Sequence, residues 1–234
     1  DVFKDLDNNY KKNVTFEEIY SLYEFDKNIR SIFLTYILEI ETVIKSLLAE
    51  LLSSKYSIDN YLLESNFDTN INPKIIQENI DKINEEINKQ NGKHEAITHY
   101  INKYSFVPPF VLIKILTWGE LSRLYSMLKQ TDRQTISKEL KNITMIRNIC
   151  AHNDRMFSFH SKFLITFKII DSNYNNKDNS TNIYMIMKSM QRLLDKDKSD
   201  EFERFINLEI EKLKNNIKSV DINLILYLMG FFNE

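Results

Sequence analysis

Glycine and proline are scarce in this chain of 234 residues, with only three of each. The hairpins of β-proteins commonly need glycine at turn positions with positive φ, and phosphate-binding loops need glycine where backbone approaches the ligand. A β-rich fold and a glycine-rich nucleotide loop are therefore not expected. The scarcity favours an all-α fold, and we expect no cofactor.

Cysteine occurs once, as Cys150, so neither an internal disulfide nor a zinc site built on several cysteines can form. No signal peptide is recognisable, and together these features predict a reducing, cytoplasmic location. The longest apolar stretch, residues 224–232, is shorter than the roughly 20 residues that a membrane-spanning helix requires. We therefore expect no membrane partner.

Charge is nearly balanced, with 31 basic and 33 acidic residues and a formal net charge of -2. No bulk positive field attracts nucleic acid, so any contact with RNA would need a local patch. His94 and His99 have no third ligand beside them, and we therefore expect no metal site. Hydrophobic residues make up 43% of the chain and no linker divides it, which predicts a single domain over residues 1–234.

Apolar residues recur at helical spacing along most of the chain. Thr15 and Glu18 have capping-box spacing, which predicts a helix start near Phe16, and Phe16, Ile19, Tyr20 and Tyr23 then share one helix face. The longest pattern extends from there to Leu51 and predicts a central scaffold helix. Later helices are predicted at residues 73–91, 97–101, 111–128, 137–151, 183–194, 200–217 and 221–231.

Three segments are predicted to differ from the rest of the helical body. Residues 73–103 are interpreted as a helical arm. Its first helix, residues 75–92, is mostly polar outside one apolar stripe and could form a dimer contact instead. Residues 163–170 are rich in β-branched and aromatic side chains, which favours a short β-hairpin or extended segment without ruling out a helix. Residues 171–182 are a polar cluster interpreted as a mobile loop.

One predicted helix, over residues 137–151, carries a polar group beside its apolar face. Leu140, Ile143 and Cys150 mark the direction of the core on a helical wheel, and Arg147 points into the same sector. An arginine there is costly unless a carboxylate or a phosphate meets it. Asn148 and His152 lie four residues apart on an adjacent face. The sequence thus predicts a polar notch at one edge of the helix.

These residue types suit cleavage of a phosphate ester. Histidine exchanges a proton near neutral pH, and the arginine fork fits phosphate oxygens. Because no acidic cluster suggests a bound metal, the predicted route is attack by the RNA 2′-hydroxyl on the adjacent phosphate, which DNA cannot follow. Asn153 and Asp154 are interpreted as helix-ending residues, which places His152 near a helix C-terminus.

A plain structural interpretation of the same residues stays open. Arg147 could pair with a carboxylate such as Glu39 or Glu41, which would make His152 an ordinary surface residue. Cys150 is interpreted as a small core residue rather than a nucleophile.

The basic residues that follow the notch have two interpretations as well. Arg155, Lys162 and Lys168 could contact an RNA backbone, and a solvated basic face is the simpler explanation.

The string RNICAHNDRMF, residues 147–157, resembles the signature of HEPN ribonucleases, which is an arginine, a polar residue, a short spacer and a histidine. Arg147, Asn148 and His152 occupy its positions. The resemblance implies that His152 is a general acid or base, that Arg147 clamps the phosphate and the transition state, and that Asn148 orients them.

Three further strings are similar to the Abi-like (AbiD/AbiF-type) family of bacterial abortive-infection proteins, and their order also matches. The strings are LYEFDKNIRSIFLTYILEIET, YSFVPPFVLIKILTWGELSRLYSML and LILYLMGF. This resemblance implies a HEPN-like helical bundle and a toxin-like ribonuclease of phage defence. It also implies a homodimer with facing Arg and His pairs, and a small noncoding RNA as a partner. A non-catalytic scaffold that holds such an RNA and a protein-interaction module are the alternatives.

Overall fold

The structure, a computed structural model, describes residues 2–129, 137–165 and 180–231. Within these ranges the chain forms nine α-helices, one short 3-10 helix and two short strands, which confirms the predicted all-α class. The same ranges contain no helix that combines the length and the apolar character of a membrane span. The α-helices are α1 (Phe16–Lys55), α2 (Pro73–Gln90), α3 (Glu95–Tyr104), α4 (Pro109–Ile115), α5 (Trp118–Met127), α6 (Ser137–His152), α7 (Ile183–Gln191), α8 (Lys196–Asn216) and α9 (Ile222–Met229).

Contacts along the chain divide it into two compact units. The first unit comprises Asp1–Ile40 and Lys141–Glu234, and the second comprises Glu41–Leu140. Helix α1, which is 40 residues long, contributes to both units. The single Abi-like domain expected over residues 1–234 stays a prediction.

The start of α1 shows the predicted capping box. The backbone N–H of Glu18 donates to Thr15 Oγ1 at 3.3 Å, and the N–H of Thr15 donates to the Glu18 carboxylate at 3.2 Å. The same carboxylate also accepts from the N–H groups of Lys218 and Ser219, at 2.6 and 2.8 Å. Burial by itself would raise the pKa of Glu18, but the hydrogen bonds from Ser219, Lys218 and Thr15 outweigh it and lower the pKa to about 2. One carboxylate thus caps α1 and holds the segment after α8.

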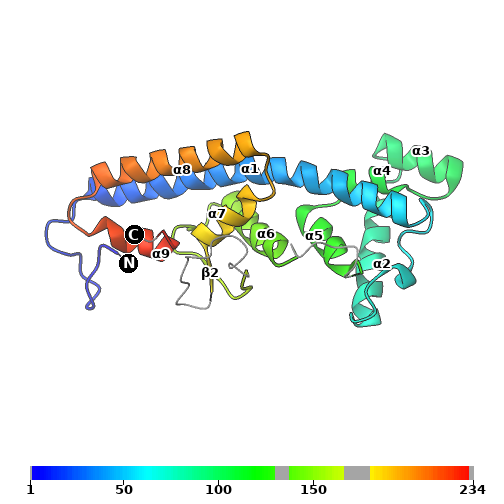
Figure 1. Cartoon of the computed structure of the whole chain (residues 1–234), viewed down its shortest axis with the longest axis horizontal. Helices are drawn as coiled ribbons and strands as arrows, with labels where there is room; N and C mark the ends of the chain where they lie inside the picture. The colour runs from blue at the N-terminus through cyan, green and yellow to red at the C-terminus, as the bar shows by residue number, and fades with distance from the viewer. Residues whose placement is uncertain (1, 130–136, 166–179, 232–234) are drawn as a thin grey trace. The chain divides into compact units, whose positions relative to one another are not determined.

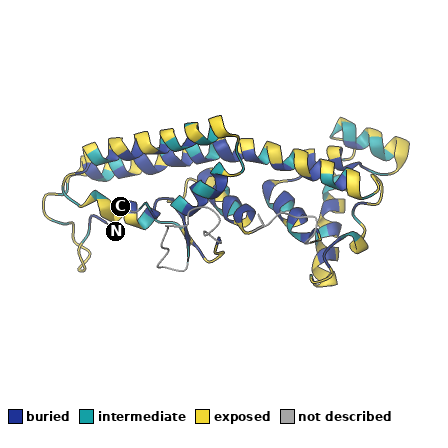
Figure 2. Cartoon of the chain, viewed as in Figure 1, coloured by how far each residue is buried: buried dark blue, intermediate teal, exposed yellow. Residues whose placement is uncertain are grey.

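Helix α8 lies alongside the N-terminal half of α1 in the first unit (Figure 1). Tyr36 donates a hydrogen bond to Glu201 at 2.8 Å, and Asn28 donates to Glu209 at 2.8 Å. Residue numbers therefore fall along α1 as they rise along α8, so the two helices are antiparallel. Phe202 is fully buried between them, and the outward turns of α8 are exposed (Figure 2).

One face of the first turns of α1 remains open to solvent. Phe16, Tyr20 and Tyr23 share this face as predicted, and their exposed fractions are 74%, 51% and 57%. The ring centroids of Phe16 and Tyr20 are 6.2 Å apart, and those of Tyr20 and Tyr23 are 6.0 Å apart. The buried face of this part of α1 consists instead of Leu22, Phe25, Ile29 and Phe33.

A short antiparallel sheet follows the notch, as the predicted fold class included, but its two strands lie at other residues than the predicted 163–170. Strand β1 (His160–Ser161) pairs with β2 (Thr181–Asn182), with His160 opposite Asn182. The described residues 163–165 lie outside these strands, and residues 166–179, which include Lys168 and most of the predicted loop at 171–182, lie outside the described residues. Asn182 also caps α7 by accepting from the N–H of Met185 at 3.1 Å.

Helix α2 is the centre of the second unit and contacts α3, α4 and α5. Asn72 caps it by accepting from the N–H of Lys74 at 2.9 Å, and Pro73 occupies the first turn. Its buried stripe is Ile76, Ile80 and Ile83. The helical arm expected over residues 73–103 stays a prediction.

Candidate functional site

Helix α6 turns its apolar face into the core in the predicted direction. Leu140 and Ile143 are fully buried, and Cys150 is nearly so. Burial raises the pKa of the Cys150 thiol to about 12, so this side chain is a neutral thiol near pH 7. The residue packs as part of the core, as the sequence indicated, and it is a poor nucleophile.

Arg147 lies at the edge of this apolar face and is half-buried. Its Nε atom is out of solvent and has no hydrogen-bond partner, and no ion pair joins Arg147 to a carboxylate in the part of the chain that the structure describes. The carboxylates considered as partners are placed elsewhere: Glu41 pairs with Lys45 at 2.7 Å, and Glu39 lines a groove against α8. Among the described residues, the fold therefore supplies no carboxylate to the guanidinium of Arg147.

His152 is the last residue of α6 and is exposed, as is Asn148 one turn earlier. Asn153 has a φ of 57°, in the left-handed region, and the N–H of Asp154 donates to the carbonyl of Ile149 at 3.0 Å. This is the hydrogen bond that closes a helix through a left-handed residue. The predicted role of Asn153 and Asp154 in ending the helix is confirmed, and His152 lies at the helix C-terminus.

The three candidate catalytic residues occupy the last two turns of α6. Asn148 and His152 share one face, whereas Arg147 projects about 100° away from Asn148. No hydrogen bond joins any two of the three residues among those described. The structure therefore places Asn148 and His152 on the solvent side and Arg147 on the core side of the same helix end, and their action as one catalytic site stays a prediction.

A buried ion pair on α1 holds the segment that follows His152, and the sequence interpretation missed it. Asp26 and Arg30 are each 5% exposed and pair with one another. The Asp26 carboxylate also accepts from the N–H groups of Met156 and Phe157, at 3.1 and 2.7 Å. Arg30 Nη1 donates to the carbonyl of Asp154 at 3.1 Å. The chain just after α6 is thereby fixed to α1, which orients the helix end that carries His152.

We call the Asp26–Arg30 pair, with its hydrogen bonds to residues 154–157, the clip. Its two charges are both buried. Burial raises the pKa of Asp26, while the N–H of Phe157 and the charge of Arg30 act in the opposite direction. The sequence did contain a signal for it. Asp26 and Arg30 are four residues apart inside the longest apolar helical pattern, where two charges are unexpected unless they meet.

The two basic residues proposed for RNA contact are both exposed. The guanidinium of Arg155 lies 5.5 Å from the ring centroid of Phe157, next to the clip. The ammonium of Lys162 lies 5.9 Å from the ring centroid of Phe163. Each is close to an aromatic ring and reaches solvent, so both can contact a polyanion, and their role in binding RNA stays a prediction.

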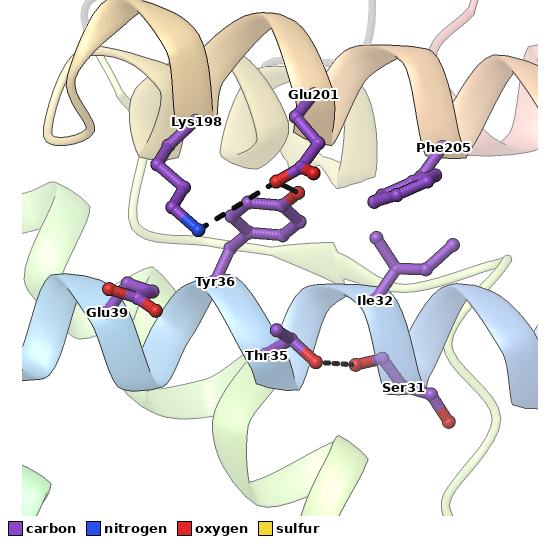
Figure 3. Close-up of a pocket in the computed structure, with 8 residues that line it drawn as sticks. All are labelled: Ser31, Ile32, Thr35, Tyr36, Glu39, Lys198, Glu201 and Phe205. Atoms are coloured by element: carbon purple, nitrogen blue, oxygen red, sulfur yellow. Dashed lines mark hydrogen bonds and ion pairs between the residues drawn. The ribbon is translucent and has the colours of Figure 1, made fainter.

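A pocket of about 260 Å³ lies between α1 and α8, away from the five candidate residues (Figure 3). Its polar groups largely satisfy each other, because Tyr36 donates to Glu201 at 2.8 Å and Lys198 approaches the same carboxylate at 3.9 Å. We interpret it as part of the packing between two helices. The lining residues are Ser31, Ile32, Thr35, Tyr36, Glu39, Lys198, Glu201 and Phe205.

The residue types that bind metal ions are not clustered in the described part of the chain. In residues 2–129, 137–165 and 180–231, no group of three or more histidine, cysteine, aspartate or glutamate side chains is placed to hold a metal ion. The expectation that the chemistry needs no metal stays a prediction.

The protein is thus of the mainly helical class, and the motif that begins at Arg147 and ends at His152 lies at the end of a core helix. Residues 1–158, from the N-terminal segment through α6 to the clipped segment, match the Abi-like protein family, and the chain belongs to that family. Membership implies a role in abortive infection, a form of phage defence. No curated protein and no solved structure matches the chain.

Proposed function

We propose that this protein is a HEPN-type endoribonuclease of the AbiD/AbiF subgroup that cleaves RNA in phage defence without a metal ion. The observation that carries the proposal is the end of α6, where Arg147 has no described carboxylate to neutralise it and His152 is exposed one turn further on. A permanently charged fork and a proton-transfer group at the same helix end are the two kinds of group that phosphate-ester cleavage needs.

The proposed reaction uses the RNA as its own nucleophile. A base removes the proton of the 2′-hydroxyl, the 2′-oxygen attacks the adjacent phosphorus, and the bond from phosphorus to the 5′-oxygen breaks. The departing 5′-oxygen takes a proton from an acid, so the products are a 2′,3′-cyclic phosphate and a 5′-hydroxyl. His152 transfers these protons, Arg147 binds the phosphate oxygens as their charge grows, and Asn148 orients the reacting groups.

A second copy of the chain completes the site in this proposal. Asn148 and His152 are exposed on one chain, so a single copy leaves the reacting phosphate in contact with bulk water. In a homodimer with two helix ends facing each other, one His152 acts as the base while the other acts as the acid. Each Arg147 then contributes to a shared, positively charged cleft.

One observation favours a non-catalytic alternative, in which the protein is a scaffold for a structured noncoding RNA. A catalytic histidine is usually held by a hydrogen bond to a third group. Among the described side chains none forms such a bond with the ring of His152. The scaffold needs only the charge of Arg147 and the surrounding basic residues.

The deciding experiment incubates the purified protein with single-stranded RNA in EDTA and compares it with His152→Ala. His160→Ala is the matched control, because His160 is also exposed and follows α6 by a few residues. We expect wild type and His160→Ala to produce 2′,3′-cyclic phosphate ends, and His152→Ala to be slower by about 10²- to 10⁴-fold.

Two outcomes contradict the assignment. Equal cleavage by wild type and His152→Ala would remove His152 from the chemistry. Retention of RNA without cleavage by either protein would favour the scaffold. DNA of the same sequence must remain intact in every case, because it has no 2′-hydroxyl.

A further inference from the structure

Phe163 is an exposed aromatic residue in the first unit, and the ammonium groups of two lysines lie close to its ring. The residue is 37% exposed. The ammonium of Lys141, on α6, lies 5.7 Å from the ring centroid, and that of Lys162 lies 5.9 Å from it. An apolar ring that is flanked by two positive charges and reaches solvent has the composition of a nucleotide-stacking surface.

The backbone that presents this ring is held at three points. The carbonyl of Phe163 accepts from Asn142 Nδ2 at 2.8 Å and from Thr181 Oγ1 at 2.9 Å. Its N–H donates to Ser161 Oγ at 3.1 Å. Because Asn142 and Thr181 are fully buried, the backbone of Phe163 is fixed before any ligand arrives, so that binding has only the side chain left to order.

The same helix face connects this ring to the candidate catalytic residues. Lys141, Asn148 and His152 are separated by seven and then four residues, spacing that aligns them along one side of α6. The axial distance from Lys141 to His152 is about 16 Å, at 1.5 Å per residue. A single strand whose scissile phosphate lies at His152 can therefore pass over Phe163 a few nucleotides away.

We infer that Phe163 stacks on a base of single-stranded RNA and that Lys141 and Lys162 bind the phosphates on either side of it, which makes the three residues a substrate subsite. This rests on the proposed function, to which it adds the class of substrate. Stacking on a ring is tolerant of base identity, so the subsite selects for an unpaired strand rather than for a sequence.

A second group of exposed aromatic residues shows why the two lysines favour Phe163 as the RNA-binding ring. Phe16, Tyr20 and Tyr23 are more exposed than Phe163, but their neighbour Lys27 is paired with Glu24 at 3.3 Å. Among the described residues, no lysine or arginine lies over the rings of that stripe. Phe16 consequently provides a matched control for the loss of an exposed ring.

The test measures binding directly, by fluorescence anisotropy of a labelled single-stranded RNA of mixed sequence. The RNA carries 2′-O-methyl groups, so it cannot be cleaved and the result is independent of catalysis. We expect Phe163→Ala to weaken binding by about tenfold or more, Phe163→Trp to retain it and Phe16→Ala to leave it unchanged.

The lysines are tested through the salt dependence of the same binding. Lys141→Gln should reduce the slope of log K against log salt concentration by about 0.7, the value for one phosphate contact on a single strand, and Lys141→Arg should restore it. Lys214→Gln is the control, because Lys214 is paired with Glu211 at 2.8 Å on α8. Lys141 is exposed, so this variant tests the subsite even if Phe163→Ala folds poorly.

The outcomes separate this subsite from the proposed ribonuclease. Equal binding by wild type and Phe163→Ala, with an unchanged slope in Lys141→Gln, would overturn the subsite and leave cleavage by His152 to be judged by its own assay. Failure of the wild-type protein to bind the RNA would also overturn it. Weaker binding by Phe163→Ala in a protein that does not cleave RNA would support the subsite and count against the ribonuclease.

Discussion

Arg30 and Arg147 lie on helices of the same compact unit, and each has a buried Nε atom without a hydrogen-bond partner among the described residues. The two residues differ in the ion pairs and hydrogen bonds that the rest of the guanidinium forms. Arg30 pairs with Asp26 and donates to the carbonyl of Asp154, so the fold itself neutralises and hydrogen-bonds it. Arg147 is half-buried and has no described carboxylate beside it. The fold neutralises Arg30, whereas Arg147 has no partner carboxylate among the described residues, as its proposed contact with a phosphate requires.

The largest expected effect is on stability, from Arg30→Ala. The variant leaves Asp26 as an uncompensated buried charge, so we expect the free energy of unfolding to fall by about 3–5 kcal/mol, measured by urea denaturation. Arg147→Ala is the matched control and should cost less than about 1 kcal/mol, because it breaks no ion pair. An equal loss in both variants would show that Arg147 is also a structural residue.

The next effect is on cleavage, from Arg147→Ala. If Arg147 binds the phosphate in the transition state, kcat at saturating RNA should fall by about 10²- to 10³-fold. Arg147→Lys should recover only part of this loss, because an ammonium lacks the planar fork. An unchanged kcat in a folded Arg147→Ala protein would contradict the proposal that Arg147 binds the phosphate in the transition state.

A smaller effect is expected from Glu18→Gln, which tests a second carboxylate bound by backbone N–H groups. Folding lowers the pKa of Glu18 from 4.5 to about 2, so the ionised form stabilises the fold above the unfolded value and this stabilisation is lost as pH falls toward 2. We expect Glu18→Gln to cost about 0.5–2 kcal/mol near neutral pH. The difference from wild type should shrink in acid, when both are measured by chemical denaturation.

Glu17→Gln provides the control for that experiment, because Glu17 is exposed on the same turn. A pH-independent difference between Glu18→Gln and wild type would contradict the role given to the Glu18 charge.

The smallest effect is expected at Cys150, which shares the buried side of α6 with Arg147. Its raised pKa and its burial predict a thiol that does not react with alkylating reagents in the folded protein and reacts readily after denaturation. Cys150→Ala should leave cleavage unchanged. A marked loss of cleavage in a stable Cys150→Ala protein would mean that the apolar side of α6 takes part in the reaction.

Local signals in the sequence predicted much of the fold. Thr15 with Glu18, and Asn72 with Pro73, fix the starts of α1 and α2 through contacts within one turn. The buried face at the start of α1 was not predictable in the same way. Phe16 and Tyr20 follow a helical pattern but remain exposed, because burial depends on a partner from elsewhere in the chain.

The candidate site was predictable only where it depends on the geometry of a single helix. The helical wheel placed Arg147 toward the core and Asn148 with His152 on another face, which follows from the geometry of one helix. The clip from Asp26 to Phe157 joins residues 131 positions apart, and no local pattern specifies such a partner. The link to RNA depends on the resemblance to HEPN proteins, since the residues themselves show only a suitable chemistry.

That clip also sets an order of events while the chain is being synthesised. Asp26 is made early, whereas Phe157 emerges from the ribosome 131 residues later, and closing so long a loop is entropically costly. A nascent chain that ends before Phe157 cannot tie the end of α6 to α1. If the chain is the ribonuclease proposed above, a nascent chain shorter than this has no oriented helix end from which to cleave the RNA of the cell that makes it.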